Sequence, residues 1–410
     1  MKADLIIRSN SIITCRDDVP LEIINGYVAV QRDLIIGVGG GEAPLEYYGH
    51  DTRFIEARGK TVIPGLIDAH THLIHGGSRE NELLLKLRGA SYLEILKSGG
   101  GILSTVANTR NASREALKEK ARHSLDQMLM HGTTTVEAKS GYGLDLETEL
   151  KCLELARELN EEHPIDIIST YMGAHAIPWE YKENSRGYVD LMIEKVMPAV
   201  AQQGLAEFMD VFCEEGVFSP EEAKILMQSG AQLGFKLKIH ADEIIPLQGA
   251  ELAAQMHAVS AEHLVAASDE GLDAMSKAGV TAVLLPGTSF YLMLDKYADA
   301  RKMLEKGIRV ALATDYNPGT CPTENLQTIM TFACFGMKLS ASEIIKGMTI
   351  NAAHAVDRAR EIGSLEVGKK ADLVILDAPN WDYVVYHFGV NHVDQVIKSG
   401  TVVVEGGHII

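Results

Sequence analysis

Eight apolar, strand-like runs alternate with amphipathic segments through the middle of the chain. Most of the segments between them have a helical pattern, for example ETELKCLELARELNEEH at 147–163 and SPEEAKILMQSGAQLG at 219–234. The eight runs lie at 61–72, 133–141, 165–175, 208–216, 235–243, 257–264, 281–287 and 309–319. Continuous apolar strands with helices between them indicate a parallel sheet buried on both faces. Eight such units predict an α/β fold, and they favour a (β/α)8 TIM barrel over a doubly wound sheet.

The two ends of the chain have a different pattern, in which turn residues separate short β-type runs. Residues 1–61 contain DLIIRSNSIITC, GYVAVQRDLIIGVG and DTRFIEARGKTVI, and the pattern returns near the end in GKKADLVILDA and VDQVIKSGTVVVEGGHII. Neither end has enough strands for an independent core. We therefore expect the two ends to pair with each other in one small antiparallel sheet unit.

The composition is that of a globular protein with an acidic balance. The 410 residues are 46% hydrophobic and 23% charged, and 38 Lys and Arg against 56 Asp and Glu give a net charge of −18. This negative net charge repels phosphate groups, so we expect neither nucleic acid nor a membrane surface as a partner. A local arginine can still bind an anionic small molecule. The start of the chain lacks a signal-peptide pattern, and the five cysteines form no CxxC pair. These features predict a cytoplasmic protein with free thiols.

Titratable residues recur where the apolar runs end. A buried strand gains nothing from ending in His or Asp. In both barrels and doubly wound sheets, function collects at the carboxyl ends of the strands. The recurrence therefore indicates a site that performs chemistry. The residues are His70, His72, Glu137, Lys139, His175, Cys213, Glu214, His240, His263 and Asp315.

The pair His70 and His72 in PGLIDAHTHL has the spacing that places both side chains on one face of a strand. Both imidazoles could bind one ion such as zinc, and the alternative is one structural and one exposed histidine. His240 in KLKIHADE and Asp315 in ALATDYNPG end two other runs. Together the four would suit a catalytic ion that also carries water, although singly the last two could be a core histidine and a turn residue. His75 lies an odd number of positions from both His70 and His72, so we do not include it among the expected metal ligands.

Two further residues have the chemistry to assist such an ion. Glu243 follows His240 by three positions, and a carboxylate there could move a proton from water to a leaving nitrogen. Its alternative is a solvated loop charge. His263 in SAEHL could stabilise negative charge on an attacked carbonyl oxygen, or it could be a packed histidine. Spacing alone does not separate these readings.

Several motifs resemble known proteins. PGLIDAHTHL, HADE, EHL and ATDYNPGT, in this order, resemble the amidohydrolase superfamily. Within it, longer segments are similar to the imidazolonepropionase family, from about residue 55 to 365. They are GGSRENELLLKLRGASYLEILKSGGGILSTVANTR, GTTTVEAKSGYGLDLETELKCL, YMGAHAIPWEY, DVFCEEGVFS and LATDYNPGTCP.

The resemblance implies a (β/α)8 metal-dependent hydrolase barrel at 62–364 and a composite β-sandwich built from 1–61 and 365–410. It also implies hydrolytic opening of 4-imidazolone-5-propanoate to N-formimidoyl-L-glutamate in histidine degradation. We expect one zinc or iron ion per subunit and a homodimer. The fourth run, DVFCEEG, has no lysine that could bridge two ions, and we rank a second ion at Glu214 low.

The resemblance also assigns roles to individual residues. The metal ligands fall on His70, His72, His240 and Asp315, and His263 falls on the histidine that the family carries on its sixth strand. Substrate contacts fall on Arg79, Tyr142, His175, Glu243, Asn317, Gly319 and Thr320. We expect Glu243, His263 and Asp315 to be catalytic.

Physical chemistry agrees with the assignment of Arg79. The substrate has a propionate tail, and a guanidinium offers a bidentate fork to a carboxylate. Arg79 lies in the loop just after the histidine pair, although it could also be a surface charge.

Two other functions stay open. A nucleobase deaminase-like amidohydrolase would use a similar ligand set, but it would have no obvious use for Arg79. A non-catalytic protein could keep the barrel, and loss of ligands would mark it. All four ligand positions are filled here.

Overall fold

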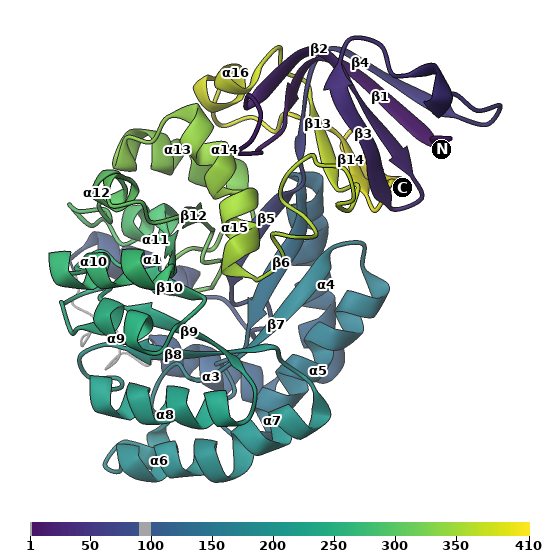
Figure 1. The fold of residues 1–410 in the computed structure, drawn as a ribbon. Coiled ribbons are helices and arrows are strands. Elements are labelled where there is room, and N and C mark those ends of the chain that lie inside the picture. The colour runs from purple at the N-terminus through teal and green to yellow at the C-terminus, as the bar shows by residue number, and fades with distance from the viewer. Residues whose placement is uncertain (1, 90–99) are drawn as a thin grey trace.

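A parallel sheet of eight strands forms the centre of the molecule (Figure 1). The computed structural model describes residues 2–89 and 100–410, so residues 90–99, part of one motif quoted above, lie outside the described residues. Each strand pairs in parallel with the next one along the chain. The strands are β5 (Leu66–Thr71), β6 (Thr133–Lys139), β7 (Asp166–Ala174), β8 (Phe208–Cys213), β9 (Lys236–Ala241), β10 (Ser260–His263), β11 (Thr281–Leu284) and β12 (Val310–Leu312).

The first and last strands of this sheet meet just beyond the end of β12. The amide of Asp315 donates to the carbonyl oxygen of His70 at 3.0 Å. The amide of His72 donates to the carbonyl oxygen of Tyr316 at 2.8 Å. The sheet is therefore a nearly closed barrel. All residues of β5 and β6 are buried, as expected of strands covered on both faces. The predicted (β/α)8 fold is confirmed.

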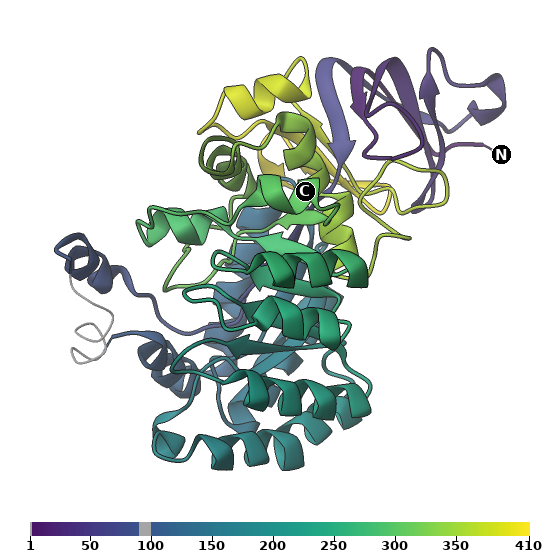
Figure 2. The same cartoon turned by 60° about the vertical axis from the view of Figure 1, so that its left-hand side comes forward.

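Helices cover the outside of the barrel (Figures 1 and 2). The helix α8 (Pro220–Gln232) shows why they form where they do, because Ser219 and Glu222 make a capping box and Pro220 occupies the first turn. The other helices among the described residues, of which α1 projects away from the barrel in Figure 2, are α1 (Glu80–Leu87), α3 (Ile102–Asn111), α4 (Arg114–Met130), α5 (Leu146–Glu162), α6 (Ser185–Leu191), α7 (Met197–Gln203), α9 (Gly249–Gln255), α10 (Asp269–Ala278), α11 (Pro286–Tyr291), α12 (Ala300–Glu305), α13 (Leu326–Met337), α14 (Ala341–Gly347), α15 (Ile350–Ala355) and α16 (Trp381–Tyr386).

The two ends of the chain form a second eight-stranded sheet, in the order β16-β15-β14-β13-β4-β1-β2-β3. Antiparallel pairing of Leu373 with Pro64 joins the two ends, as expected. One pair differs from the expected antiparallel pattern, because Leu5 pairs with Arg53 in parallel. The strands are β1 (Leu5–Ile13), β2 (Glu22–Gln31), β3 (Leu34–Gly40), β4 (Arg53–Pro64), β13 (Leu373–Leu376), β14 (Val393–Lys398), β15 (Thr401–Glu405) and β16 (His408–Ile409).

This second sheet bends over itself and encloses its own core. The amide of Ile35 donates to the carbonyl oxygen of Lys369, and the amide of Gly368 donates to the carbonyl oxygen of Ile35, both at 2.9 Å. Buried residues from both ends of the chain fill the interior, among them Val28, Val62 and Ile397. The sandwich-like unit is thus one hydrogen-bonded sheet. In the part of the chain that the structure describes, no helix is long and apolar enough to cross a membrane.

The second sheet also fixes the start of the barrel. Strand β4 continues through Gly65 directly into β5, and the amide of Gly65 donates to the carbonyl oxygen of Asp372 at 2.9 Å. A Cβ atom at position 65 would lie 2.2 Å from Oγ1 of Thr134 on β6. Glycine leaves room there for the Thr134 side chain. The chain is therefore anchored at the residue just before β5.

Candidate active site

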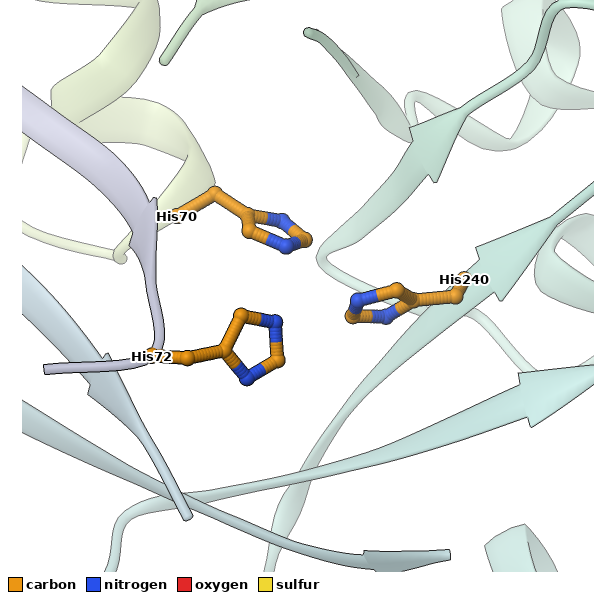
Figure 3. Close-up of side chains that lie close together, drawn as sticks. All are labelled: His70, His72 and His240. Atoms are coloured by element: carbon orange, nitrogen blue, oxygen red, sulfur yellow. The ribbon is translucent and has the colours of Figure 1, made fainter. Parts of the chain in front are cut away.

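Three histidines meet at the carboxyl end of the barrel (Figure 3). His70 lies on β5, His72 follows one residue after the end of that strand, and His240 lies on β9. One ring nitrogen of each lies within 4.8 Å of the others. All three are buried. The spacing of two on a strand therefore does place both members of the pair on the inner face.

The buried nitrogens of this histidine group fit a metal ion. Nε2 of His70, Nδ1 of His72 and Nε2 of His240 have no hydrogen-bond partner among the described residues, and Nδ1 of His240 has only the nearby carboxylate of Asp210, at 3.1 Å. Burial, followed by the neighbouring positive groups, lowers the pKa of His70 and of His72 well below its ordinary value. The two rings are therefore neutral, which is the form that binds metal. Buried, neutral and unpartnered nitrogens that converge are what a metal site requires.

Asp315 lies beside two members of the histidine group. Its Oδ1 is 3.5 Å from Nε2 of His70 and 3.7 Å from Nε2 of His72. Its Oδ2 accepts a hydrogen bond of 2.6 Å from Thr288. Burial raises the pKa of Asp315 to about 6, against the opposing effect of that hydrogen bond and of His240. The carboxylate is thus in place to join the histidines around one ion.

Glu243 and His263 lie next to each other at the same end of the barrel. Nε2 of His263 is 3.5 Å from Oε2 of Glu243. Burial, with the nearby charges of Asp315 and Glu214, raises the pKa of Glu243 to about 8. Burial lowers the pKa of His263 well below its ordinary value. The two groups can exchange or hold a proton close to the histidine group.

His175 and Tyr142 also lie against the histidine group. The ring of His175 stacks on that of His72, with centroids 4.6 Å apart and an interplanar angle of 13°. The Tyr142 ring lies 5.1 Å from His175 and 5.6 Å from His72. Burial lowers the pKa of His175 to about 3, so its ring is neutral at pH 7. Both side chains can contact a molecule bound over the histidines.

Arg79 is already paired in the structure. Its Nε and Nη2 donate to the two carboxylate oxygens of Glu82, at 2.9 and 2.8 Å. Its Nη1 faces the loop after β12, because a Cβ atom at Gly319 would lie only 2.0 Å from it. Arg79 therefore links the start of α1 to the loop that follows Asp315, and one edge of its fork is held by Glu82.

Asn317 organises the turn that carries Gly319 and Thr320. Its Oδ1 accepts from the amides of both residues at 2.8 Å. Its Nδ2 donates to the carbonyl oxygen of Asp315 and to Oγ1 of Thr320, both at 2.7 Å. These bonds fix the turn behind Asp315.

His75 and Glu214 stay outside the histidine group. His75 is buried, and its Nδ1 lies 2.9 Å from the carbonyl oxygen of His72. The two oxygens of Glu214 accept from the backbone amides of Glu215 and Ile244. Among the described residues, the one group of His, Cys, Asp and Glu that converges closely enough for an ion is His70, His72 and His240.

Behind the ligands lies a set of charged residues that spacing along the chain did not reveal. Oε2 of Glu262 is 3.0 Å from Nδ1 of His70, and Oδ2 of Asp210 is 3.1 Å from Nδ1 of His240. The sequence did contain one sign that Asp210 has a special role, because it is a charged residue inside the short apolar strand FMDVFC. Glu262 stands next to His263 and had no separate signal.

The fold and the site together define a class of protein. A (β/α)8 barrel with converging histidines at the carboxyl ends of its strands is the arrangement of a metal-dependent hydrolase. The model of the amidohydrolase family matches residues 61–403. The chain belongs to that family.

Curated relatives place it more closely, among the imidazolonepropionases of this family. An imidazolonepropionase of Treponema denticola is 62% identical over 385 residues, covering 94% of this chain and 93% of the relative. One of Alkaliphilus oremlandii is 59% identical over 389 residues, covering 95% and 92%. One of Fusobacterium nucleatum is 51% identical over 412 residues, covering 98% and 99%.

Solved structures share the fold at low sequence identity. A triazine hydrolase variant aligns with a TM-score of 0.76 at 19% identity, covering 99% of this chain and 96% of that one. A zinc-bound adenosine deaminase of Xanthomonas campestris aligns with a TM-score of 0.75 at 17% identity, covering 100% and 94%. These similarities concern the architecture alone.

Proposed function

We propose that this protein hydrolyses the ring of 4-imidazolone-5-propanoate to N-formimidoyl-L-glutamate, a step of histidine degradation. The observation that carries the proposal is the 51–62% identity to imidazolonepropionases along nearly the whole chain. The buried histidine group at the barrel mouth gives this assignment a chemical basis.

The reaction adds one water molecule across a carbon–nitrogen bond. The water oxygen bonds to the ring carbonyl carbon, and the bond from that carbon to the ring nitrogen breaks. The nitrogen takes up a proton, and the carbonyl carbon becomes a carboxylate. The site must therefore orient a water molecule, stabilise negative charge on oxygen and transfer a proton.

We infer that His70, His72, His240 and Asp315 hold one ion, zinc or iron. Support comes from the unpartnered buried nitrogens of the three histidines and from the position of the Asp315 carboxylate beside them. Such an ion, when bound, supplies an acidic water and polarises a carbonyl oxygen. Three nitrogens and one carboxylate suit both metals.

The proton transfers fall to residues beside this group. The carboxylate of Asp315 can take a proton from the attacking water, and Glu243 can deliver a proton to the leaving nitrogen. The raised pKa of Glu243, about 8, suits the delivery, because most of this group is protonated at neutral pH. His263, neutral and 3.5 Å from Glu243, can donate a hydrogen bond to the oxygen that gains negative charge.

The substrate would be held by the residues over the histidine group. His175 and Tyr142 face the reacting ring, and Arg79 attracts the propionate from the loop after β5. Since Glu82 holds Nε and Nη2 of Arg79, the propionate would reach the guanidinium from its Nη1 edge, next to Gly319. The turn fixed by Asn317 shapes that edge.

A direct assay tests the assignment. Purified enzyme loaded with zinc or iron should open the ring of imidazolone propionate. The reaction is monitored by the loss of substrate absorbance and by the appearance of N-formimidoyl-glutamate. Cytosine, guanine and adenosine serve as competing substrates in parallel assays. Deamination of a nucleobase without ring opening would reject the proposed substrate and leave the fold assignment intact.

Two further expectations belong to the whole protein. We propose a homodimer in the cytoplasm, supported by the metabolic role of the relatives and by the prevalence of two-fold assemblies. Light scattering on purified protein, with the 44.6 kDa chain as the unit, measures the assembly.

A further inference from the structure

We propose that Glu262, Asp210 and Lys139 are positioning residues for the metal site, because they hold His70 and His240 in the orientation that binds the ion. This inference rests on the proposed metal site and goes beyond it. None of the three residues is among the proposed ligands or substrate contacts. All three side chains are completely buried inside the barrel.

The first contact fixes His70. Its Nδ1 lies 3.0 Å from Oε2 of Glu262, which comes from β10, and its Nε2 is the nitrogen left without a partner. An imidazole that donates from one nitrogen to a carboxylate presents the other as a lone pair. Ser260 donates to the second oxygen of Glu262 at 2.5 Å, so the carboxylate itself is held.

The second contact fixes His240. Oδ2 of Asp210, on β8, lies 3.1 Å from Nδ1 of His240, and Oδ1 accepts from the His240 amide at 3.2 Å. Asp210 thus contacts both the ring and the backbone of the ligand. It is held in turn by Lys139 on β6, whose Nζ donates to Oδ2 at 2.7 Å.

Lys139 connects this carboxylate to two further buried charged residues, Glu137 on β6 and Lys238 on β9. Its Nζ also donates to Oε1 of Glu137 at 2.9 Å, and Oε2 of Glu137 is 2.9 Å from Nζ of Lys238. The chain of contacts runs from His240 through Asp210, Lys139 and Glu137 to Lys238. Rotation of Asp210 away from His240 would break an ion pair that water cannot replace.

The charges behind the ligands also suit a cation. Glu137, Asp210 and Glu262 supply three carboxylates against the two ammonium groups of Lys139 and Lys238, so the buried set has one acidic group in excess. A buried excess of this sign is stabilised by a positive ion at the neighbouring histidines.

The test is the zinc affinity of the full-length chain. Wild type, Glu262→Gln, Asp210→Asn and Lys139→Met are stripped with a chelator and titrated with zinc against a chromophoric competitor. We expect the zinc dissociation constant to rise about 10–100-fold in each variant, the range for groups that orient metal-binding histidines. Thermal unfolding of each metal-free protein is measured alongside.

Glu149→Gln is the matched control. Glu149 is also a buried carboxylate, but its Oε1 accepts from the amides of Gly143 and Leu144 and contacts no ligand. This variant should keep the zinc affinity of the wild type, even where its melting temperature falls. If a variant of Asp210 or Glu262 does not fold, Lys139→Met and Ser260→Ala report on the same two contacts while leaving the carboxylates in place.

The outcomes are separable. Wild type that binds no zinc would reject the proposed metal site. Wild type that binds zinc, with folded variants whose zinc affinity stays within threefold of it, would overturn the positioning role. A purely structural role would lower the melting temperature of the metal-free variants without changing their zinc dissociation constants.

Discussion

At the scale of single residues, the site depends on a few side chains whose protonation is set by burial. His70 and His72 are neutral because the charged imidazole would lose its hydration. Glu243, in the same surroundings, has a pKa of about 8, so it keeps a proton that an exposed glutamate would lose. One physical effect therefore sets the protonation of both the proposed metal ligands and the proposed proton donor.

Glu243→Gln tests the proton transfer. Glutamine keeps the shape of the side chain but has no acidic proton to donate and cannot accept one at neutral pH. We expect kcat to fall by about 10²–10⁴-fold with little change in KM, the range for a lost general acid or base. Steady-state kinetics on metal-loaded enzyme measures both constants. A kcat near that of the wild type would remove Glu243 from this role.

Arg79→Lys tests the binding of the propionate. Lysine keeps the charge but loses the planar fork that Glu82 holds from one side. We expect KM to rise by about tenfold, which corresponds to about 1.4 kcal/mol, while kcat changes less. The exposed Arg88→Lys on the other end of α1 is the control and should leave both constants unchanged. An unchanged KM in Arg79→Lys would place the carboxylate elsewhere.

The sequence predicted that the side chains of His70 and His72 converge, because the geometry of this pair is local. A spacing of two on a strand is enough to place His70 and His72 on one face. Glu262 and Asp210 could not be predicted in this way. Glu262 is 192 positions away from the histidine that it contacts, and only the closing of the barrel brings the two together.

At the scale of elements, apolar runs identified all eight barrel strands because both faces of such strands are buried. The relative direction of the strands in the second sheet was harder to predict from the sequence. β1 and β4 are parallel since the chain crosses back through residues 41–52, and local patterns do not record where such a connection leads. The spacing of Arg79 and Glu82 at i+3 was visible in the sequence, but Arg79 was interpreted as a substrate contact or a surface charge and not as the partner of Glu82.

The loop after β12 offers a test at this scale. Gly319→Ala would place a methyl group 2.0 Å from Nη1 of Arg79, so the flexible end of the arginine must move. We expect KM to rise as in Arg79→Lys, with a melting temperature close to that of the wild type. The control is Gly40→Ala in the second sheet, where the nearest atom is 3.8 Å from the added carbon. A Gly319→Ala enzyme with normal KM would separate this loop from substrate binding.

At the scale of the whole molecule, ion pairs join the barrel to the second sheet. Asp166 at the start of β7 accepts from Lys398 at 2.8 Å and from Lys370 at 3.1 Å. Lys398 also donates to Asp372 at 2.7 Å. Partial burial raises the pKa of Asp166, and the two ammonium groups outweigh this effect and leave the pKa below its ordinary value.

Asp166→Asn should therefore reduce stability in a pH-dependent way. A carboxyl with a lowered pKa in the folded state stabilises that state above its unfolded pKa, and the contribution is lost as the pH falls through the folded pKa. Since Asp166 is 40% exposed, we expect a loss of at most about 1 kcal/mol in the free energy of unfolding at pH 7. This loss should shrink below about pH 4.

Urea titrations between pH 3.5 and 8 measure the effect. Asp51→Asn is the control, because this carboxylate is 96% exposed and its only ion-pair partner among the described residues is His50. A loss of stability in Asp166→Asn that is constant across this range would show that its charge is not what joins the two sheets.

The pairing of β4 with β13 joins the beginning of the chain to its end, which matters while the protein is being synthesised. Pro64 pairs with Leu373, which is synthesised 309 positions later. At about 5–20 residues per second, synthesis of the intervening chain takes about 15–60 s. During that time the edge of β4 is open to other strands. A ribosome that stalls before β13 would release a chain in which β4 pairs with β1 alone, and the open edge of β4 would favour aggregation.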